Sequence, residues 1–140
     1  MAAFNKFLSF VEAVAEGVHD FASDSLKIAL SNTAPTNTDT VFAPGGAHPA
    51  PAAANGYAPT EATLTSSGQT AGVEKLILQD VVFTAAGGQI GPFRYVILYN
   101  DDAVGDELIG WWDYGSSITL ETGETFTVDL DAANGVLTIT

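Results

Sequence analysis

The sequence contains no cysteine, so disulfide bonds and thiolate metal sites contribute nothing to its stability. Basic residues are also scarce: four Lys and Arg stand against 17 Asp and Glu, and the formal net charge is −13. Proteins that bind nucleic acids need clustered Lys and Arg to neutralise phosphates. Because Lys6, Lys27, Lys75 and Arg94 are scattered along the chain, we expect no nucleic-acid partner.

Reactive side chains are few as well. The chain has two histidines, His19 and His48, and no Gly-x-Ser-x-Gly motif that would present a nucleophilic serine. We expect His19 to have a structural role near the end of a helix, and His48 to be exposed to solvent. The sequence therefore favours a protein that is not an enzyme and that carries no cofactor.

Long hydrophobic runs are absent. No apolar stretch approaches the ~20 residues of a membrane-spanning helix, so we expect no membrane partner. The N-terminus does not match a secretory signal, because Ser9, Glu12 and Glu16 interrupt its apolar stretch. We expect this segment to belong to the mature protein.

What the sequence does contain is an unusual surface composition. Only 15% of residues are charged and the mean hydropathy is +0.21, so apolar and small neutral side chains must cover part of the surface. A chain of this kind often hides part of its surface in an assembly. The acidic charge has two explanations: it keeps copies of the protein apart in solution, or it complements a basic partner surface.

Residues 1–21 have the period of an amphipathic helix. Phe10 lies off the apolar stripe and adds a second apolar contact. The helix either lies across its own domain or forms an arm that docks on a neighbouring subunit. The stripe consists of Phe4, Phe7, Leu8, Val11, Val14, Ala15 and Val18.

A first strand is expected within residues 22–34, where Leu26, Ile28 and Leu30 alternate with less apolar neighbours. Residues 36–59 are rich in Pro, Ala and Gly, and proline disfavours both helices and central strands. We expect a long loop there, and it is the best candidate for a segment that becomes ordered on contact with a partner.

Residues 60–140 predict the remaining strands, separated by polar turns. Together with the first strand they predict a mainly β fold: an antiparallel, jelly-roll-like β-sandwich of about eight strands with one N-terminal helix, in a single domain of residues 1–140. The segment 93–99 is almost wholly apolar, so we place it centrally, covered on both faces. The expected strands are 60–66, 74–84, 93–99, 107–113, 117–121, 125–130 and 136–140.

An acidic turn follows the central strand and offers several oxygen ligands, which suits a hard cation such as calcium. Its spacing differs from that of an EF-hand loop, and a hairpin turn built from Asp and Gly explains it equally well. Adjacent carboxylates are expected here from composition alone, so we assign them neither catalysis nor a metal site. The residues concerned are Asn100, Asp101, Asp102, Asp106, Glu107 and Asp113.

Trp111 and Trp112 are neighbours in an expected strand, so their side chains must point to opposite faces. We expect one of them in the core and the other turned outward or into a protein interface. An outward tryptophan is typical of contact hot spots, and it would also suit the stacking of sugars.

Several segments resemble a family of small structural proteins of tailed bacteriophages. They are FNKFLSFVEAVAEGVHDF and SLKIALSNTAP near the N-terminus, and IGPFRYVILYND, LIGWWDYGSSITL and GETFTVDLDAANGVLTI in the second half. The resemblance spans nearly the whole chain except residues 36–59. It is fairly specific for the family and weak for the position in the particle.

The resemblance implies a virion component without catalysis. Within that class we favour a head decoration, or cement, protein that binds the major capsid protein on the outer surface of the phage head. Such proteins associate with themselves, often as trimers. A tail-tube or other tail subunit is the main alternative, and a carbohydrate-binding adhesin on the virion surface is a third.

On this interpretation, the helix, the loop and the tryptophan pair supply contacts to partners or to other copies of the chain. The expected contact residues are Phe4, Phe7, Phe10, Val11, Val14, Phe42, Pro44, Pro49, Pro51, Tyr57, Trp111 and Trp112.

Overall fold

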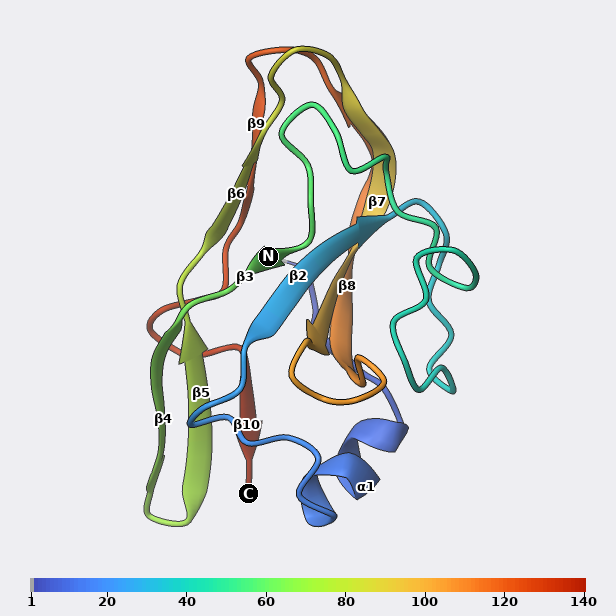
Figure 1. Ribbon diagram of the computed structural model, residues 1–140. Coiled ribbons are helices and arrows are strands. Elements are labelled where there is room, and N and C mark those ends of the chain that lie inside the picture. Colours follow the sequence, from blue (N-terminus) through green and yellow to red (C-terminus); the bar gives the residue numbers. More distant parts are fainter. Residues whose placement is uncertain (1) are drawn as a thin grey trace.

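A computed structural model describes residues 2–140 as two layers of antiparallel strands with one short helix (Figure 1). The first layer is a five-stranded sheet in the order β1-β8-β7-β2-β3. Its strands are β1 (Asn5–Lys6), β8 (Leu108–Leu120), β7 (Ile90–Asn100), β2 (Leu26–Ser31) and β3 (Thr60–Glu61).

The second layer consists of two smaller sheets, in the orders β10-β5-β4 and β6-β9. Every strand pair in both layers is antiparallel. The expected mainly β, sandwich-like fold is confirmed, with about ten strands instead of eight. The strands of this layer are β4 (Leu64–Thr70), β5 (Val73–Leu78), β6 (Val81–Thr84), β9 (Thr125–Val128) and β10 (Leu137–Ile139).

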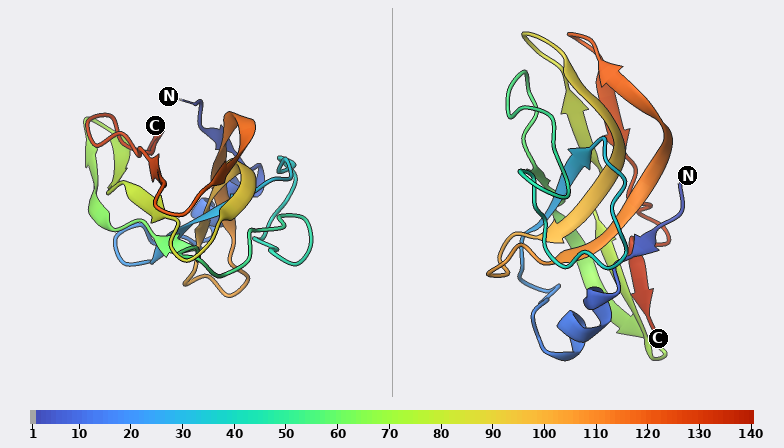
Figure 2. Two further views of the ribbon diagram at one scale, coloured as in Figure 1. Left: turned by 90° about the horizontal axis from the view of Figure 1, so that it is seen from above. Right: turned by 90° about the vertical axis from the view of Figure 1, so that its right-hand side faces the viewer.

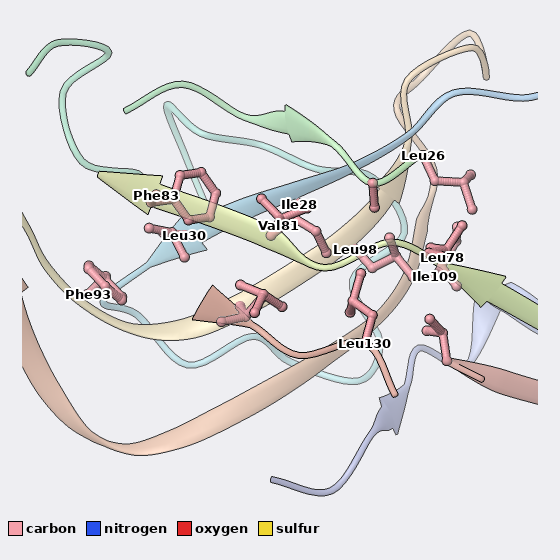
Figure 3. Close-up of a cluster of buried hydrophobic side chains, with 14 of the residues drawn as sticks. Leu26, Ile28, Leu30, Leu78, Val81, Phe83, Phe93, Leu98, Ile109 and Leu130 are labelled. Atoms are coloured by element: carbon pink, nitrogen blue, oxygen red, sulfur yellow. The ribbon is translucent and has the colours of Figure 1, made fainter. Parts of the chain in front are cut away.

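The main core lies between the two layers (Figure 3). Leu26, Ile28 and Leu30 project from β2 because alternate residues of a strand share a face. They meet Leu78 and Phe83 of the second layer, and all five side chains are at most 2% exposed. Burying a Leu, Ile or Phe side chain stabilises the fold by about 2 kcal/mol, so this cluster holds the layers together.

A second core covers the outer face of the five-stranded sheet. Ile97 and Tyr99 of β7 point into it, whereas Val96 and Leu98 point into the main core. The prediction that residues 93–99 form a central strand covered on both faces is therefore confirmed for its second half. The second core comprises Phe7, Ala29, Phe42, Ile97, Tyr99 and Leu108.

The loop of residues 36–59 supplies the cover for that outer face, and Figure 2 shows it beside the sheet on the side away from β4 and β5. The Phe42 ring stacks on Tyr99 with centroids 4.5 Å apart. The backbone is anchored where Phe42 N–H donates to Asp106 O and Leu108 N–H donates to Thr40 O. The sequence made this loop the best candidate for a segment that becomes ordered on contact with a partner; in the structure its Phe42 and His48 pack on the protein's own sheet.

The expected helix of residues 1–21 is also wrong in extent. Of residues 2–21, only Ser9–Ala15 (α1) are helical, and Asn5 and Lys6 before it pair as β1 with β8. Phe7 N–H donates to Ile109 O, which keeps the chain extended up to the helix. Because the helix starts late, Phe10 and Ala13 form its buried face, and Val11 of the expected stripe is 56% exposed.

Two strand boundaries differ from the pattern. The expected strand 74–84 breaks at Gln79 and Asp80 into β5 and β6, which belong to different sheets. The Asp80 carboxylate accepts a hydrogen bond from Leu130 N–H at 2.8 Å, and Gln79 N–H donates to Thr63 O. Conversely, the segments 107–113 and 117–121 join into the single strand β8.

Within residues 2–140 there is no helix with the length and apolar character that a membrane span requires.

Candidate functional site

The sandwich is open on one side, between β8 and β9. A groove with a volume of about 190 Å³ lies there, and core side chains reach the surface at its floor beside aromatic rings on its walls. We call this groove the β8–β9 seam. It is lined chiefly by Val96, Trp112, Tyr114, Phe126, Thr127 and Val128.

An exposed tyrosine marks the mouth of the seam. Tyr114 is 52% exposed, and its ring meets Phe126 edge to face with centroids 5.4 Å apart. Phe126 in turn meets the fully buried Phe93 at 5.0 Å in the same geometry. Such edge-to-face pairs contribute about 1 kcal/mol each beyond their buried area. They hold Tyr114 in place, so it is an aromatic anchor that is ordered before any partner arrives.

The N-terminal segment closes one end of the seam. Ala2 lines both the seam and a smaller neighbouring hollow that also contains Phe4 and Trp112. The Phe4 ring meets Trp112 with centroids 5.3 Å apart and lies directly over Gly110, where a Cβ atom would overlap it. The absence of a side chain at Gly110 therefore allows this segment to pack against β8.

One acidic residue borders the seam. Among the described residues that line it, Asp129 carries a charge and no Lys or Arg is present. On the opposite face of β8, the Arg94 guanidinium donates to the Asp113 carboxylate at 2.8 Å and 3.1 Å. Hydrogen bonds from Arg94 and from Gly115 N–H hold the pKa of Asp113 below its usual value. This pair leaves Asp129 to set the charge at the groove, which suits a partner with apolar and basic side chains.

The tryptophan pair is divided as predicted between the two faces of its strand. Trp112 packs against the main core and lines the seam, whereas Trp111 packs against the second core. Both are partly buried, and the Trp111 ring meets Tyr95 edge to face at 6.0 Å. Neither tryptophan therefore stands free on the surface as a stacking platform.

The other expected contact residues fall into two groups. Phe7, Phe10, Phe42 and Tyr57 are 0%, 5%, 7% and 3% exposed, so their assignment to a partner surface is wrong. They are core residues, and Tyr57 even accepts a hydrogen bond from Leu30 N–H inside the sheet. The accessible or partly accessible residues are Phe4, Val11, Val14, Pro44, Pro49 and Pro51.

A second apolar surface lies on α1. Leu8 and Val11 are each 56% exposed, and a shallow groove of about 220 Å³ runs between the helix and β10. Val14 and Ile139 lie on its two sides. The helix thus packs on its own domain through one face and leaves the other uncovered, so both alternatives for its role remain compatible with its position.

Both histidines are buried, which corrects the expectation that His48 is exposed to solvent. The His48 side chain is 0% exposed. Its Nδ1 accepts a hydrogen bond from Ala43 N–H at 3.2 Å, so the proton sits on Nε2, which faces the Asp39 carboxylate at 3.1 Å. His48 therefore organises the loop.

His19 lies after the end of α1 and packs with Phe10 and Phe21 in a cluster of three rings whose centroids are 5.6, 5.8 and 6.0 Å apart. Burial lowers its pKa, although Glu107 and Asp24 partly oppose this shift. Its Nδ1 lies 3.1 Å from Asn100 Nδ2, while its buried Nε2 has no hydrogen-bond partner among the described residues. A structural role fits this environment.

The acidic turn at residues 100–107 is held by local hydrogen bonds. The buried Asn100 side chain accepts from Asp102 N–H and Ala103 N–H, and Asp101 pairs with Lys27 at 2.8 Å. Burial and the neighbouring carboxylates raise the pKa of Asp106. Residues 2–140 contain no group of three His, Asp or Glu side chains placed to hold a metal ion.

The expected contact residues did not include Tyr114 and Phe126, the exposed ring and the partly buried ring of the seam. A signal for Tyr114 was available: it stands two residues after Trp112 in one strand, so both side chains share a face. No such signal exists for Phe126, because its approach to Tyr114 depends on how the two layers meet.

Comparison of the chain with protein-family models, with curated proteins and with solved structures found no match.

Proposed function

We propose that this chain is a non-enzymatic structural subunit of a tailed-phage particle. Within that class it is a decoration protein that binds the major capsid protein on the outer surface of the head and stabilises the lattice. The resemblance of its sequence segments supplies the class. The observation that carries the binding role is the β8–β9 seam, where core and aromatic side chains meet solvent.

The seam has the physical properties of a docking surface. Aromatic residues with fixed rings dominate the binding energy of protein interfaces, and Tyr114 is held in place by Phe126. An apolar partner side chain that enters the groove would cover Val96 and Val128 as well. The net charge of −13 favours association with a basic surface and mainly raises the association rate.

The test is co-sedimentation of the purified protein with empty heads, at increasing protein concentration. Tyr114→Ala should weaken binding by about tenfold or more, because it removes the anchor. Val82→Ala is the matched control: Val82 is 54% exposed on β6 and does not line the seam. We expect this control to bind like the original protein.

Other outcomes would replace the proposal. If the protein is lost from purified heads but kept in tails, and forms rings or tubes on its own in electron micrographs, it is a tail subunit. If saccharides on a glycan array bind it and change its tryptophan fluorescence, it is an adhesin. If Tyr114→Ala and the original protein bind heads equally well, the seam is not the surface that binds heads.

A further inference from the structure

The longest edge strand of the second layer is β4, Leu64–Thr70 (Figure 1). It pairs with β5 on one side and, among the strands of residues 2–140, with none on the other. The remaining outer strands of the three sheets have two to four residues each. Five of the seven β4 residues are exposed. Their unpaired backbone groups form an open template for another strand.

Natural edge strands are usually protected, and β4 is not. Proteins block open edges with Lys, Pro, bulges or very short strands. In β4 there is no charged residue and no proline, and its one irregularity lies at the Leu64/Ser66 end. Beyond Trp111, where its pairing with β1 stops, β8 is also open on one side, but there it carries Asp113, whose carboxylate accepts a hydrogen bond from Gly115 N–H. The lack of protection on β4 therefore indicates a strand that has a partner.

The hairpin register shows which groups of β4 are free. Thr70 and Val73 face each other across a two-residue turn, which makes them a hydrogen-bonded pair. Hydrogen bonding alternates along an antiparallel ladder, so Gly68 also points its groups toward β5. Ser67 and Gln69 then direct their N–H and C=O groups outward.

We propose that β4 pairs with β4 of a second copy of this chain, antiparallel, about a twofold axis at Gly68. In this register Ser67 of each copy faces Gln69 of the other, so the free groups of both copies meet. The two Gly68 residues lie opposite each other at the axis, where strands approach most closely. A Cβ at Gly68 would contact nothing within 4 Å in the free chain, so the approach is unobstructed. The contact joins the three-stranded sheets of two copies into one.

Charge argues for a second copy as the occupant. Two chains of net charge −13 repel each other, so they can approach only through uncharged surface. No charged residue occurs between Glu61 and Glu74, a segment that contains all of β4. The nearest acid on β5, Glu74, is turned onto its own chain, where it accepts a hydrogen bond from Ser67 Oγ at 2.7 Å. This dimer does not depend on binding to a capsid.

The test is sedimentation equilibrium of the full chain up to about 1 mM, because a contact this small belongs to the weak class of interfaces. We expect the mass to rise from 14.5 kDa to twice that value and no further. Raising the salt from about 50 to about 500 mM should strengthen the dimer, because salt screens the repulsion between the acidic copies.

Two variants of one residue isolate the strand contact. Ser67→Pro removes an outward N–H without touching the pairing with β5, and it should weaken the dimer by about tenfold or more. Ser67→Ala is the matched control, since it loses the same hydroxyl, and with it the bond to Glu74, but keeps the N–H, and we expect it to associate more strongly than Ser67→Pro. Gly68→Asp, which places two carboxylates at the axis, should also abolish dimers.

The proposal is overturned if the chain stays monomeric at about 1 mM, where the weakest specific contacts of this class are still populated. A trimer as the end state would overturn it too, because a twofold contact closes at two copies. The proposal is also overturned if Ser67→Pro dimerises as strongly as Ser67→Ala and the two variants have the same urea unfolding midpoint.

Discussion

The buried side chain of Asn100 provides the sharpest stability test in this molecule. It is 0% exposed and links two segments far apart in the sequence. Its Nδ2 donates to the Asp24 carboxylate at 2.6 Å and lies 3.1 Å from His19 Nδ1. Its Oδ1 accepts from Asp102 N–H at 3.0 Å and Ala103 N–H at 3.2 Å. The residue therefore ties the connection after α1 to the turn between β7 and β8.

The cost of Asn100→Ala follows from these bonds. The two backbone N–H groups each lose a bond worth about 1 kcal/mol, and the bond to a charged carboxylate is worth about 2 kcal/mol. Some of these groups will find water after the substitution, because the turn is partly exposed. We expect the free energy of unfolding to fall by about 3 to 4 kcal/mol, which is a large part of the total for a domain of this size.

Asn100→Asp is the informative companion because it keeps the shape of the side chain. The acceptor Oδ1 remains, but a second carboxylate oxygen takes the place of the donor beside Asp24 Oδ2. Two carboxylates this close cannot both be ionised cheaply, so the folded protein holds one proton more tightly than the unfolded chain does. Folding of this variant is then favoured as the pH falls through the raised folded pKa.

The measurement is urea unfolding followed by the fluorescence of Trp111 and Trp112, at pH 7 and at pH 5. At pH 7 the Asp variant should be at least as unstable as the Ala variant. At pH 5 the Asp variant should regain part of the loss, while the Ala variant should not. If the two variants respond alike to pH, or if Asn100→Ala costs less than about 1 kcal/mol, the side chain does not link the two segments.

Three further predictions use the same assay. Ala71 has φ of 52° in the turn after β4, a conformation that costs an alanine about 1 kcal/mol, so Ala71→Asn should stabilise the protein by up to that amount. Burial lowers the pKa of His19, so the unfolded chain takes up its proton first; stability should fall as the pH drops below 6.5, and His19→Phe should remove this part of the pH dependence. Gly110→Ala forces the Phe4 ring away from β8 and should cost about 1 to 3 kcal/mol, whereas Gly68→Ala, with open space around it, should be neutral.

The sequence pattern predicted the strands well where a strand stays in one sheet and each of its faces has the same surroundings along its length. Alternation marked β2 and β9, and the apolar run at 93–99 marked the central β7, because burial on two faces leaves no room for polar residues. It failed at Gln79 and Asp80, where the chain passes from one sheet to another without losing its extended form. The bonds that fix this transition come from Thr63 and Leu130, which no local pattern can reveal.

The predictions for the helix and the loop differed from the structure for a related reason. Apolar residues at helical spacing in residues 4–18 predicted one helical stripe, but Phe7 lies before the start of the helix and packs in the second core. In the loop, proline and glycine indicated the lack of regular structure correctly, yet composition gave no sign that Phe42 and His48 would pack on the outer face of the sheet. Tertiary contacts, which depend on distant strands, decided both outcomes.

The candidate site depends even more on such contacts, because the seam exists only where the two layers diverge. Its location bears on how the two proposals fit together. The seam and β4 share no residue, and they belong to different sheets. A dimer formed through β4 would therefore leave both of its seams free. On a lattice that repeats the same site, the second seam would bind at a raised effective concentration once the first is engaged. A seam of about 190 Å³ with one aromatic anchor is a modest contact alone, and pairing through β4 is the means by which two modest contacts could hold one protein on a lattice.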